Sequence, residues 1–128
     1  MILDTSAIIA ILLKEPGHER LVAKLGQAGA IGVGAPTLTE AGIVLTARLG
    51  PAGMSMLGRL IQESGASIVP FGGDHWKAAV DAFDRFGKGR HPAALNFGDC
   101  LSYATASLAR QPLLAIGQDF AQTDLDLA

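Results

Sequence analysis

Short apolar runs alternate with longer segments of helical periodicity along this chain, and this alternation limits the folds open to it. The apolar runs cover residues 1–3, 30–34, 67–71 and 113–116. Each run is as long as a short strand, whereas the segments between them are long enough for helices. Strands separated by helices pair in parallel, so the pattern predicts an α/β fold with a mainly parallel sheet. Residues 124–128 would add an edge strand, which gives four to five strands in all.

Glycine and proline residues set the ends of the predicted helices. Gly29 follows the second helix, and Gly50 with Pro51 separates the third from the fourth. Asp74 and Asn96 are suited to cap the last two helices at their N-termini. The predicted helices cover residues 5–13, 18–27, 37–49, 51–65, 74–86 and 96–109.

Length and composition favour one domain, residues 1–128, with a mainly aliphatic core. Hydrophobic residues make up 49% of the chain and aromatic residues 5%. The apolar stretch at residues 7–13 is too short to span a membrane and no basic segment precedes it, so we expect a cytoplasmic protein. The single Cys100 excludes an internal disulfide and a cysteine-rich zinc site. The net charge of −2 means that any contact with nucleic acid must come from a local patch or a metal ion.

Four acidic residues stand where a parallel sheet would gather them. Asp4 directly follows the first apolar run, Glu40 and Asp119 follow the second and the fourth, and Asp99 lies at the start of the last helix. These positions meet outside the carboxyl ends of parallel strands. Carboxylates gathered there repel one another unless a cation lies among them. Mg²⁺ and Mn²⁺ take oxygen ligands, so the pattern predicts a site for one of these ions.

Helix capping is the alternative explanation for each acid taken singly. Asp4 suits the N-cap of the helix that follows it, and Asp119 suits a cap of a short turn. Glu40 stands three residues after a threonine, the spacing of a capping box, and Asn96 with Asp99 is a looser version of it. Capping does not require all four acids at one sheet edge. It also leaves the apolar setting of Asp4 unexplained, so we favour the metal site.

The same residues carry a resemblance to a known family. The segments Asp4-Thr5-Ser6-Ala7, Leu95-Asn96-Phe97-Gly98-Asp99-Cys100 and Gly117-Gln118-Asp119-Phe120 occur in order and at fitting spacing. With Glu40, they make the chain similar to PIN-domain ribonucleases, and within that group to VapC-type toxins of toxin–antitoxin pairs. The resemblance implies a three-layer α/β/α fold, in which helices cover both faces of a parallel sheet.

The resemblance also implies an activity and roles for the acids. Asp4, Glu40 and Asp99 become acidic metal-site residues, with Asp119 as a fourth. Relatives often carry Thr-x-Asp-x-Asp-Phe near the end, whereas Gly117 stands here in place of the earlier acid, so only Asp119 can serve. The implied reaction is hydrolysis of RNA phosphodiester bonds by a water that one or two metal ions activate. A cognate antitoxin and a homodimer are the implied protein partners.

For each of the polar residues near the predicted acidic edge, two interpretations of its role are possible. Ser6 either bonds the backbone of the first helical turn or holds a metal ligand, or a water bound to the metal, in position through a hydrogen bond. Asn96 is a helix cap first and a site residue second. Arg85, Lys88 and Arg90 form the densest basic stretch, which is either a solvated loop or a contact for RNA phosphates. Because this stretch leads into the acidic edge, we favour the RNA contact.

The sequence is also compatible with functions other than that of a ribonuclease. A PIN-like module that binds RNA or a protein without cleaving it would also have this sequence pattern. A metal-dependent phosphatase or a DNase is a third possibility. For the antitoxin, the apolar residues of segments 5–13 and 18–27 exceed what a short chain can bury. Some must face the sheet, and we expect the rest, with Leu12 and Leu25 as the residues to test, to form a groove for an amphipathic helix.

Overall fold

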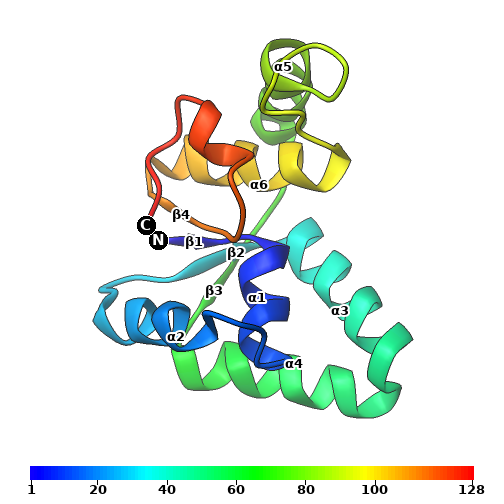
Figure 1. Ribbon diagram of the computed structural model, residues 1–128, viewed down its shortest axis with the longest axis vertical. Helices are drawn as coiled ribbons and strands as arrows, with labels where there is room; N and C mark the ends of the chain where they lie inside the picture. Colours follow the sequence, from blue (N-terminus) through cyan, green and yellow to red (C-terminus); the bar gives the residue numbers. More distant parts are fainter.

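Four short parallel strands form the centre of the molecule (Figure 1). A computed structural model describes residues 1–128. The strands are β1 (Ile2–Leu3), β2 (Gly32–Gly34), β3 (Ser67–Val69) and β4 (Leu113–Leu114). They lie in the order β3-β2-β1-β4, with every pair parallel. The predicted mainly parallel α/β sheet is therefore confirmed.

Helices cover both faces of this sheet (Figure 1). One layer holds α1 (Thr5–Leu12), α2 (His18–Gln27), α3 (Ala35–Leu49) and α4 (Pro51–Ser64). The other holds α5 (Gly73–Phe86) and α6 (Phe97–Ala109), followed by a short 3-10 helix (Phe120–Gln122). This arrangement confirms the three-layer α/β/α architecture. None of these helices combines the length and the apolar character that a membrane crossing needs.

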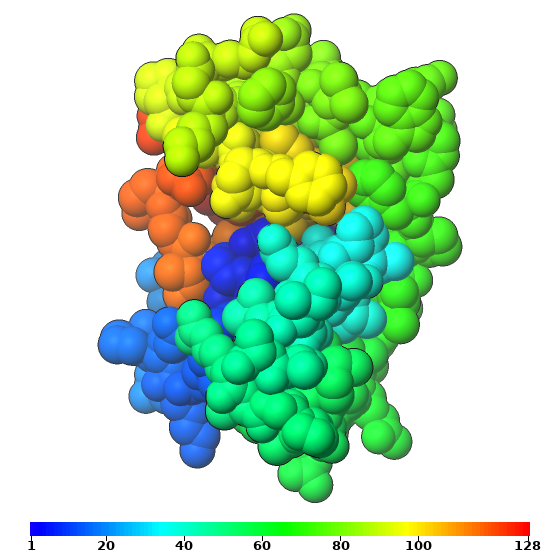
Figure 2. All heavy atoms as spheres, turned by 90° about the vertical axis from the view of Figure 1, so that its right-hand side faces the viewer, coloured from blue at the N-terminus to red at the C-terminus, as the bar shows by residue number.

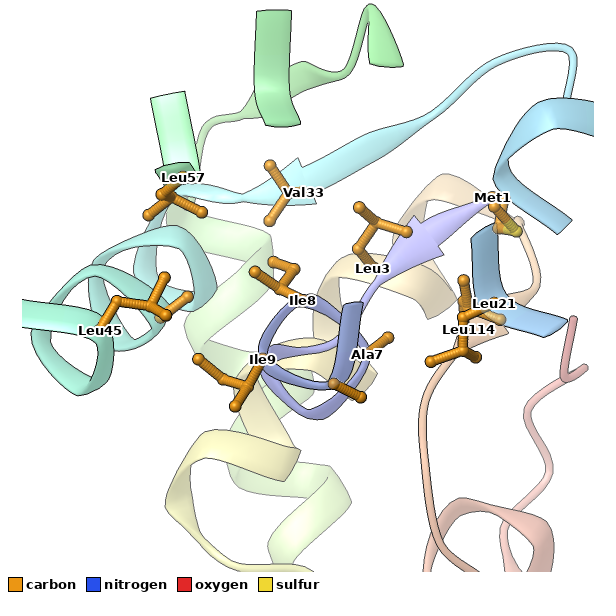
Figure 3. Packing of buried hydrophobic residues seen from close by; sticks show 12 residues of the cluster. Met1, Leu3, Ala7, Ile8, Ile9, Leu21, Val33, Leu45, Leu57 and Leu114 are labelled. Carbon is orange, nitrogen blue, oxygen red and sulfur yellow. The ribbon is translucent and has the colours of Figure 1, made fainter. Parts of the chain in front are cut away.

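Alternation along the strands divides the core between the two layers. Leu3, Val33 and Leu114 point toward the layer of α1 to α4, where they pack with residues such as Ile8 and Leu45 (Figure 3). Their strand neighbours Ile2 and Leu113 instead pack with α5 and α6. Successive side chains of a strand point to opposite faces, so residues buried on both faces account for the apolar runs.

Most helix boundaries agree with the predictions, and two differ for a local reason. Helix α3 begins at Ala35 because Pro36 fits the first turn of a helix, where no backbone N–H is needed. The cap of α5 is Gly72, whose N–H donates to His75 Nδ1 at 3.1 Å, so the prediction that Asp74 caps this helix is wrong. The tail adds one bridge, between Leu113 and Leu127, and no fifth strand.

Candidate metal centre

Asp4 lies at the carboxyl end of β1, between β2 and β4, and only 4% of the residue is exposed. The backbone places it there, because its N–H donates to Leu114 O at 2.9 Å. Its Oδ2 accepts a hydrogen bond of 3.0 Å from the Ser6 N–H, so Asp4 also caps α1. The capping prediction is correct for this residue, and it is compatible with a second role for the same carboxylate.

Two hydroxyl groups hold the Asp4 carboxylate from either side. Ser6 Oγ donates to Oδ2 and Ser102 Oγ donates to Oδ1, each at 2.6 Å. Ser6 Oγ also accepts from the Ile116 N–H at 2.9 Å, which ties the start of α1 to the segment after β4. Ser6 therefore contacts the acid itself, as a residue that orients a ligand would.

Ser102 is a residue that sequence reasoning missed. It is fully buried on α6, and its hydroxyl also lies 3.2 Å from Thr37 Oγ1. Its separation of three residues from Asp99 places the two on one face of the helix, which is the signal that could have found it.

Asp99 lies in the first turn of α6 and is half-buried. It forms reciprocal hydrogen bonds with the cap Asn96: the Asp99 N–H donates to Asn96 Oδ1 at 2.9 Å, and the Asn96 N–H donates to Asp99 Oδ2 at 3.0 Å. The predicted capping box is thus present. Burial raises the pKa of Asp99 to about 6, opposed by the Asn96 hydrogen bond and assisted by repulsion from Asp4, Asp119 and Glu40. The three other acids therefore lie within electrostatic range of Asp99.

Glu40 reaches this site from the second turn of α3. Because that helix begins at Ala35, the alternative in which Glu40 closes a capping box is wrong. Thr5 Oγ1 donates instead to Glu40 Oε1. The Glu40 carboxylate also lies directly against Gly98, where a Cβ atom would clash with it. Helices α3 and α6 thus come close together beside Asp99.

Asp119 is exposed and precedes the 3-10 helix without a capping hydrogen bond from its side chain. The predicted cap at this position is therefore absent. Gly117, two residues earlier, has φ +97°, a backbone conformation that glycine adopts readily and other residues rarely do. An aspartate in the place of Gly117 would be strained in this loop, and this loop contributes Asp119 alone.

The ligand chemistry at this edge consists of carboxylate oxygens flanked by hydroxyls. Such a donor set matches Mg²⁺ and Mn²⁺. In this structure, however, no three His, Cys, Asp or Glu side chains lie close enough together to hold a metal ion. The metal assignment of the four acids accordingly remains a prediction.

The basic stretch divides into paired and unpaired residues. Arg85 bonds Asp124 at 3.0 Å and Tyr103 Oη at 3.3 Å, which holds the tail against α5 and α6. Arg90 bonds Asp84 at 3.1 Å. Lys88 is exposed and its side chain has no acidic partner. All three residues lie in or beside the predicted loop, but only the side chain of Lys88 forms no ion pair.

A family model described as "PIN domain" matches residues 1–125. The chain belongs to the PIN-domain family. It is 53% identical over 127 residues to a protein named Ribonuclease VapC36 of Mycobacterium tuberculosis, covering 98% of this chain and 91% of that protein. It is 38% identical to Ribonuclease VapC of Mycolicibacterium smegmatis, covering 98% and 97% of the two chains. These relatives place the chain in the VapC group of PIN domains.

Solved structures agree with this fold at low sequence identity. The crystal structure of the Sarcin-Ricin loop cleaving toxin VapC20 of Mycobacterium tuberculosis has a TM-score of 0.81 at 15% identity, covering 99% of this chain and 97% of that one. VapBC2 from Rickettsia felis, bound to a DNA fragment from its promoter, has a TM-score of 0.79 at 15% identity and covers 99% and 96%. The PIN-like fold predicted from the sequence is confirmed.

Proposed function

We propose that this chain is a metal-dependent endoribonuclease and the toxin of a toxin–antitoxin pair, acting as one domain in the cytoplasm. The observation that carries the proposal is the meeting of buried Asp4 and half-buried Asp99 at the carboxyl edge of the sheet. This edge is where an open α/β fold binds its ligands. The 53% identity to a protein named as a ribonuclease supports the same activity.

Asp4 and Asp99 would hold the metal ion, with Glu40 and Asp119 as further acidic groups. A bound Mg²⁺ or Mn²⁺ supplies a low-pKa water and stabilises charge that develops on the phosphate. The protein's own hydroxyls keep the acids in place: Ser6 and Ser102 fix both oxygens of Asp4. Thr5 Oγ1 donates to one oxygen of Glu40, Oε1. No side-chain nucleophile is required for this hydrolysis.

Cations near the site would hold the RNA backbone. Lys88 has no acidic partner, so its ammonium group is available for a phosphate. Arg90 would have to leave Asp84 to do the same, although an exposed ion pair of this kind is weak. Arg85 already has three polar partners, and RNA contact by Arg85 therefore has the least support.

An apolar groove on the sheet face opposite to α5 and α6 is suited to bind a helix of the antitoxin. It lies between α1, α2 and α4 and has a volume of about 600 Å³. Ile11, Leu12, Val22, Leu25, Met56 and Leu60 line it. Lys14, Arg59 and Glu63 provide charges at the same groove. An amphipathic helix would cover the apolar lining and pair with these charges.

A homodimer is supported by an apolar stripe on α5. Trp76, Val80 and Phe83 are spaced as one face of the helix, and each is at least 42% exposed. Exposed apolar residues that share one helix face often mark a contact with another chain.

Incubation of purified protein with RNA, in Mn²⁺ and in EDTA, tests the proposed activity. We expect new RNA ends in Mn²⁺ only, and none on DNA of the same sequence. RNA that is retained by the protein in a gel-shift assay but never cut in Mn²⁺ would favour the binding module. Cleavage of DNA or of a phosphomonoester alone would favour the DNase or the phosphatase.

A further inference from the structure

Phe97 has the most exposed side chain among the large hydrophobic residues of this molecule. The residue is 80% exposed, and it belongs to neither of the two core clusters. Its aromatic ring therefore contributes little to the stability of the isolated chain. An aromatic ring left in water is suited to contact something outside the chain.

The backbone of Phe97 is held rigidly beside the acidic residues. It is the first residue of α6, between the cap Asn96 and Gly98, and the reciprocal bonds of Asn96 and Asp99 fix this turn. Gly98 lies directly against the Glu40 carboxylate. In Figure 2 the start of α6, in yellow, borders a recess next to the start of α1, in blue, and the orange segment after β4. Phe97 thus belongs to the same first turn of α6 as Asp99, beside the candidate metal centre.

The loop that carries Lys88 pairs through its backbone with the chain just before Phe97. The Lys88 N–H donates to Leu95 O at 2.9 Å, and Gly87 and Leu95 form a bridge, so the basic loop is joined to the chain just before Phe97. The Lys88 side chain is exposed and unpaired. A cation for a phosphate and an aromatic face for a base are the two elements with which proteins bind single-stranded nucleic acid.

We propose that Phe97 stacks on an unpaired base next to the phosphodiester bond that is cut. This inference rests on the proposed ribonuclease function and narrows its substrate to single-stranded or looped RNA, because a base in a duplex has no free face to offer. Stacking accepts any base, so Phe97 adds affinity and fixes the position of the strand more than it selects a sequence. The sequence neighbours of Phe97 in this turn, Asn96 and Asp99, are polar, and a polar surrounding fits a nucleotide better than an apolar protein face.

The test measures binding and cleavage of a short single-stranded RNA by the full chain. Dissociation constants are measured in EDTA by fluorescence anisotropy, and kcat/KM is measured in Mn²⁺. The variants are Phe97→Ala, Phe97→Tyr and, as a matched control on the far end of the same helix, Leu108→Ala. The RNA is used intact and with an abasic nucleotide at each position in turn.

We expect Phe97→Ala to weaken binding of the intact RNA about 5- to 150-fold, which is the range found for one base stacked on an aromatic ring. Phe97→Tyr and Leu108→Ala should behave as the wild type. At one abasic position the difference between the wild type and Phe97→Ala should disappear, since no base is left to stack. The melting temperature should be the same in all variants.

Equal dissociation constants for the wild type and Phe97→Ala would overturn the proposal, whether or not the RNA is cut. Two other results would overturn the proposal in favour of a contact between protein chains. One is a loss of RNA affinity in Phe97→Ala that stays the same at every abasic position. The other is a molecular mass of Phe97→Ala, measured by light scattering, that is lower than that of the wild type. A base-dependent loss of binding without any cleavage by the wild type would uphold stacking and refute the ribonuclease function instead.

Discussion

At the scale of single residues, the buried carboxylate of Asp4 depends on its hydrogen-bond donors. A buried charge is costly unless hydrogen bonds compensate it, and Asp4 receives three, two from Ser6 and one from Ser102. The Ser102 hydroxyl is fully buried, so no water can replace it without a change in packing.

We predict that Ser102→Ala lowers the free energy of unfolding by about 1–3 kcal/mol, because one Asp4 oxygen loses its donor inside the protein. Urea unfolding of the metal-free protein measures this. Ser107→Ala, an exposed serine on the same helix, is the control and should change little. Equal effects of the two substitutions would contradict the role given to Ser102.

Asp99 provides a pH-dependent test of the acidic cluster. The folded state keeps a proton on Asp99 up to about pH 6, whereas in the unfolded chain the pKa is near 3.8. Unfolding therefore releases a proton between these values, and raising the pH through this window destabilises the metal-free fold. An asparagine at this position has no charge to desolvate and can still accept the Asn96 N–H.

We predict that Asp99→Asn in EDTA is more stable than the wild type at pH 7.5, by on the order of 1 kcal/mol after screening at a half-exposed group. The advantage should shrink toward pH 4. Melting temperatures at both pH values measure it, with exposed Asp74→Asn as the control. A difference that does not vary with pH would mean that neither burial nor the neighbouring acids raise the pKa of Asp99 in the folded chain.

At the scale of elements, the sequence predicts those parts that local chemistry decides. Helix α2 has the predicted bounds, His18–Gln27, because glycines flank an amphipathic segment. The predicted start of α3 at residue 37 differs from the observed start at Ala35, because Pro36 lies in the first turn of the helix and does not precede it. The spacing of Ser102 from Asp99 indicates which face of α6 it shares, but the partners of Ser102 and Arg85 could not be predicted from spacing. These partners, Asp4 and Asp124, are distant in sequence and meet only in the folded chain.

The basic loop gives a prediction at this scale. Lys88→Ala should reduce the salt dependence of single-stranded RNA binding by about 0.7 in the slope of log K against log[salt], and Lys88→Ala with Arg90→Ala by up to about 1.4. Binding isotherms at several salt concentrations measure the slope. Lys77→Ala, an exposed lysine on α5, is the control. An unchanged slope in the double variant would show that the loop is only solvated surface.

The groove between α1, α2 and α4 leads to a prediction about the antitoxin. Leu12 and Leu25 were predicted to contact the antitoxin, but both pack partly against the core, whereas Val22 is 47% exposed. Val22→Glu should therefore weaken neutralisation by the antitoxin at least 10-fold, since one charged group buried at an apolar interface costs more than about 1.4 kcal/mol. RNA cleavage should be unchanged. Titration of the antitoxin into a cleavage assay measures this, and full neutralisation of the folded variant would exclude the groove.

At the scale of the whole molecule, the topology brings the distant acids together. Parallel pairing of β1 with β2 and β4 places Asp4, the start of α3 and the segment after β4 at one edge, and α6 begins there. This juxtaposition could be predicted from the alternation of strands and helices. The distances between the acids could not be predicted, because they depend on how side chains pack, as the Glu40 carboxylate does against the backbone of Gly98.

If this edge of the sheet is a metal-dependent site for RNA cleavage, the carboxylates of Asp4 and Asp99 are required for the reaction. The most direct measurement is the rate of cleavage of a single-stranded RNA in Mn²⁺ by the wild type and by Asp4→Asn with Asp99→Asn, both shown to be folded by circular dichroism. We predict cleavage by the wild type that EDTA abolishes, and a rate for the double variant no higher than that in EDTA. Cleavage by the folded double variant at the rate of the wild type would contradict the claim.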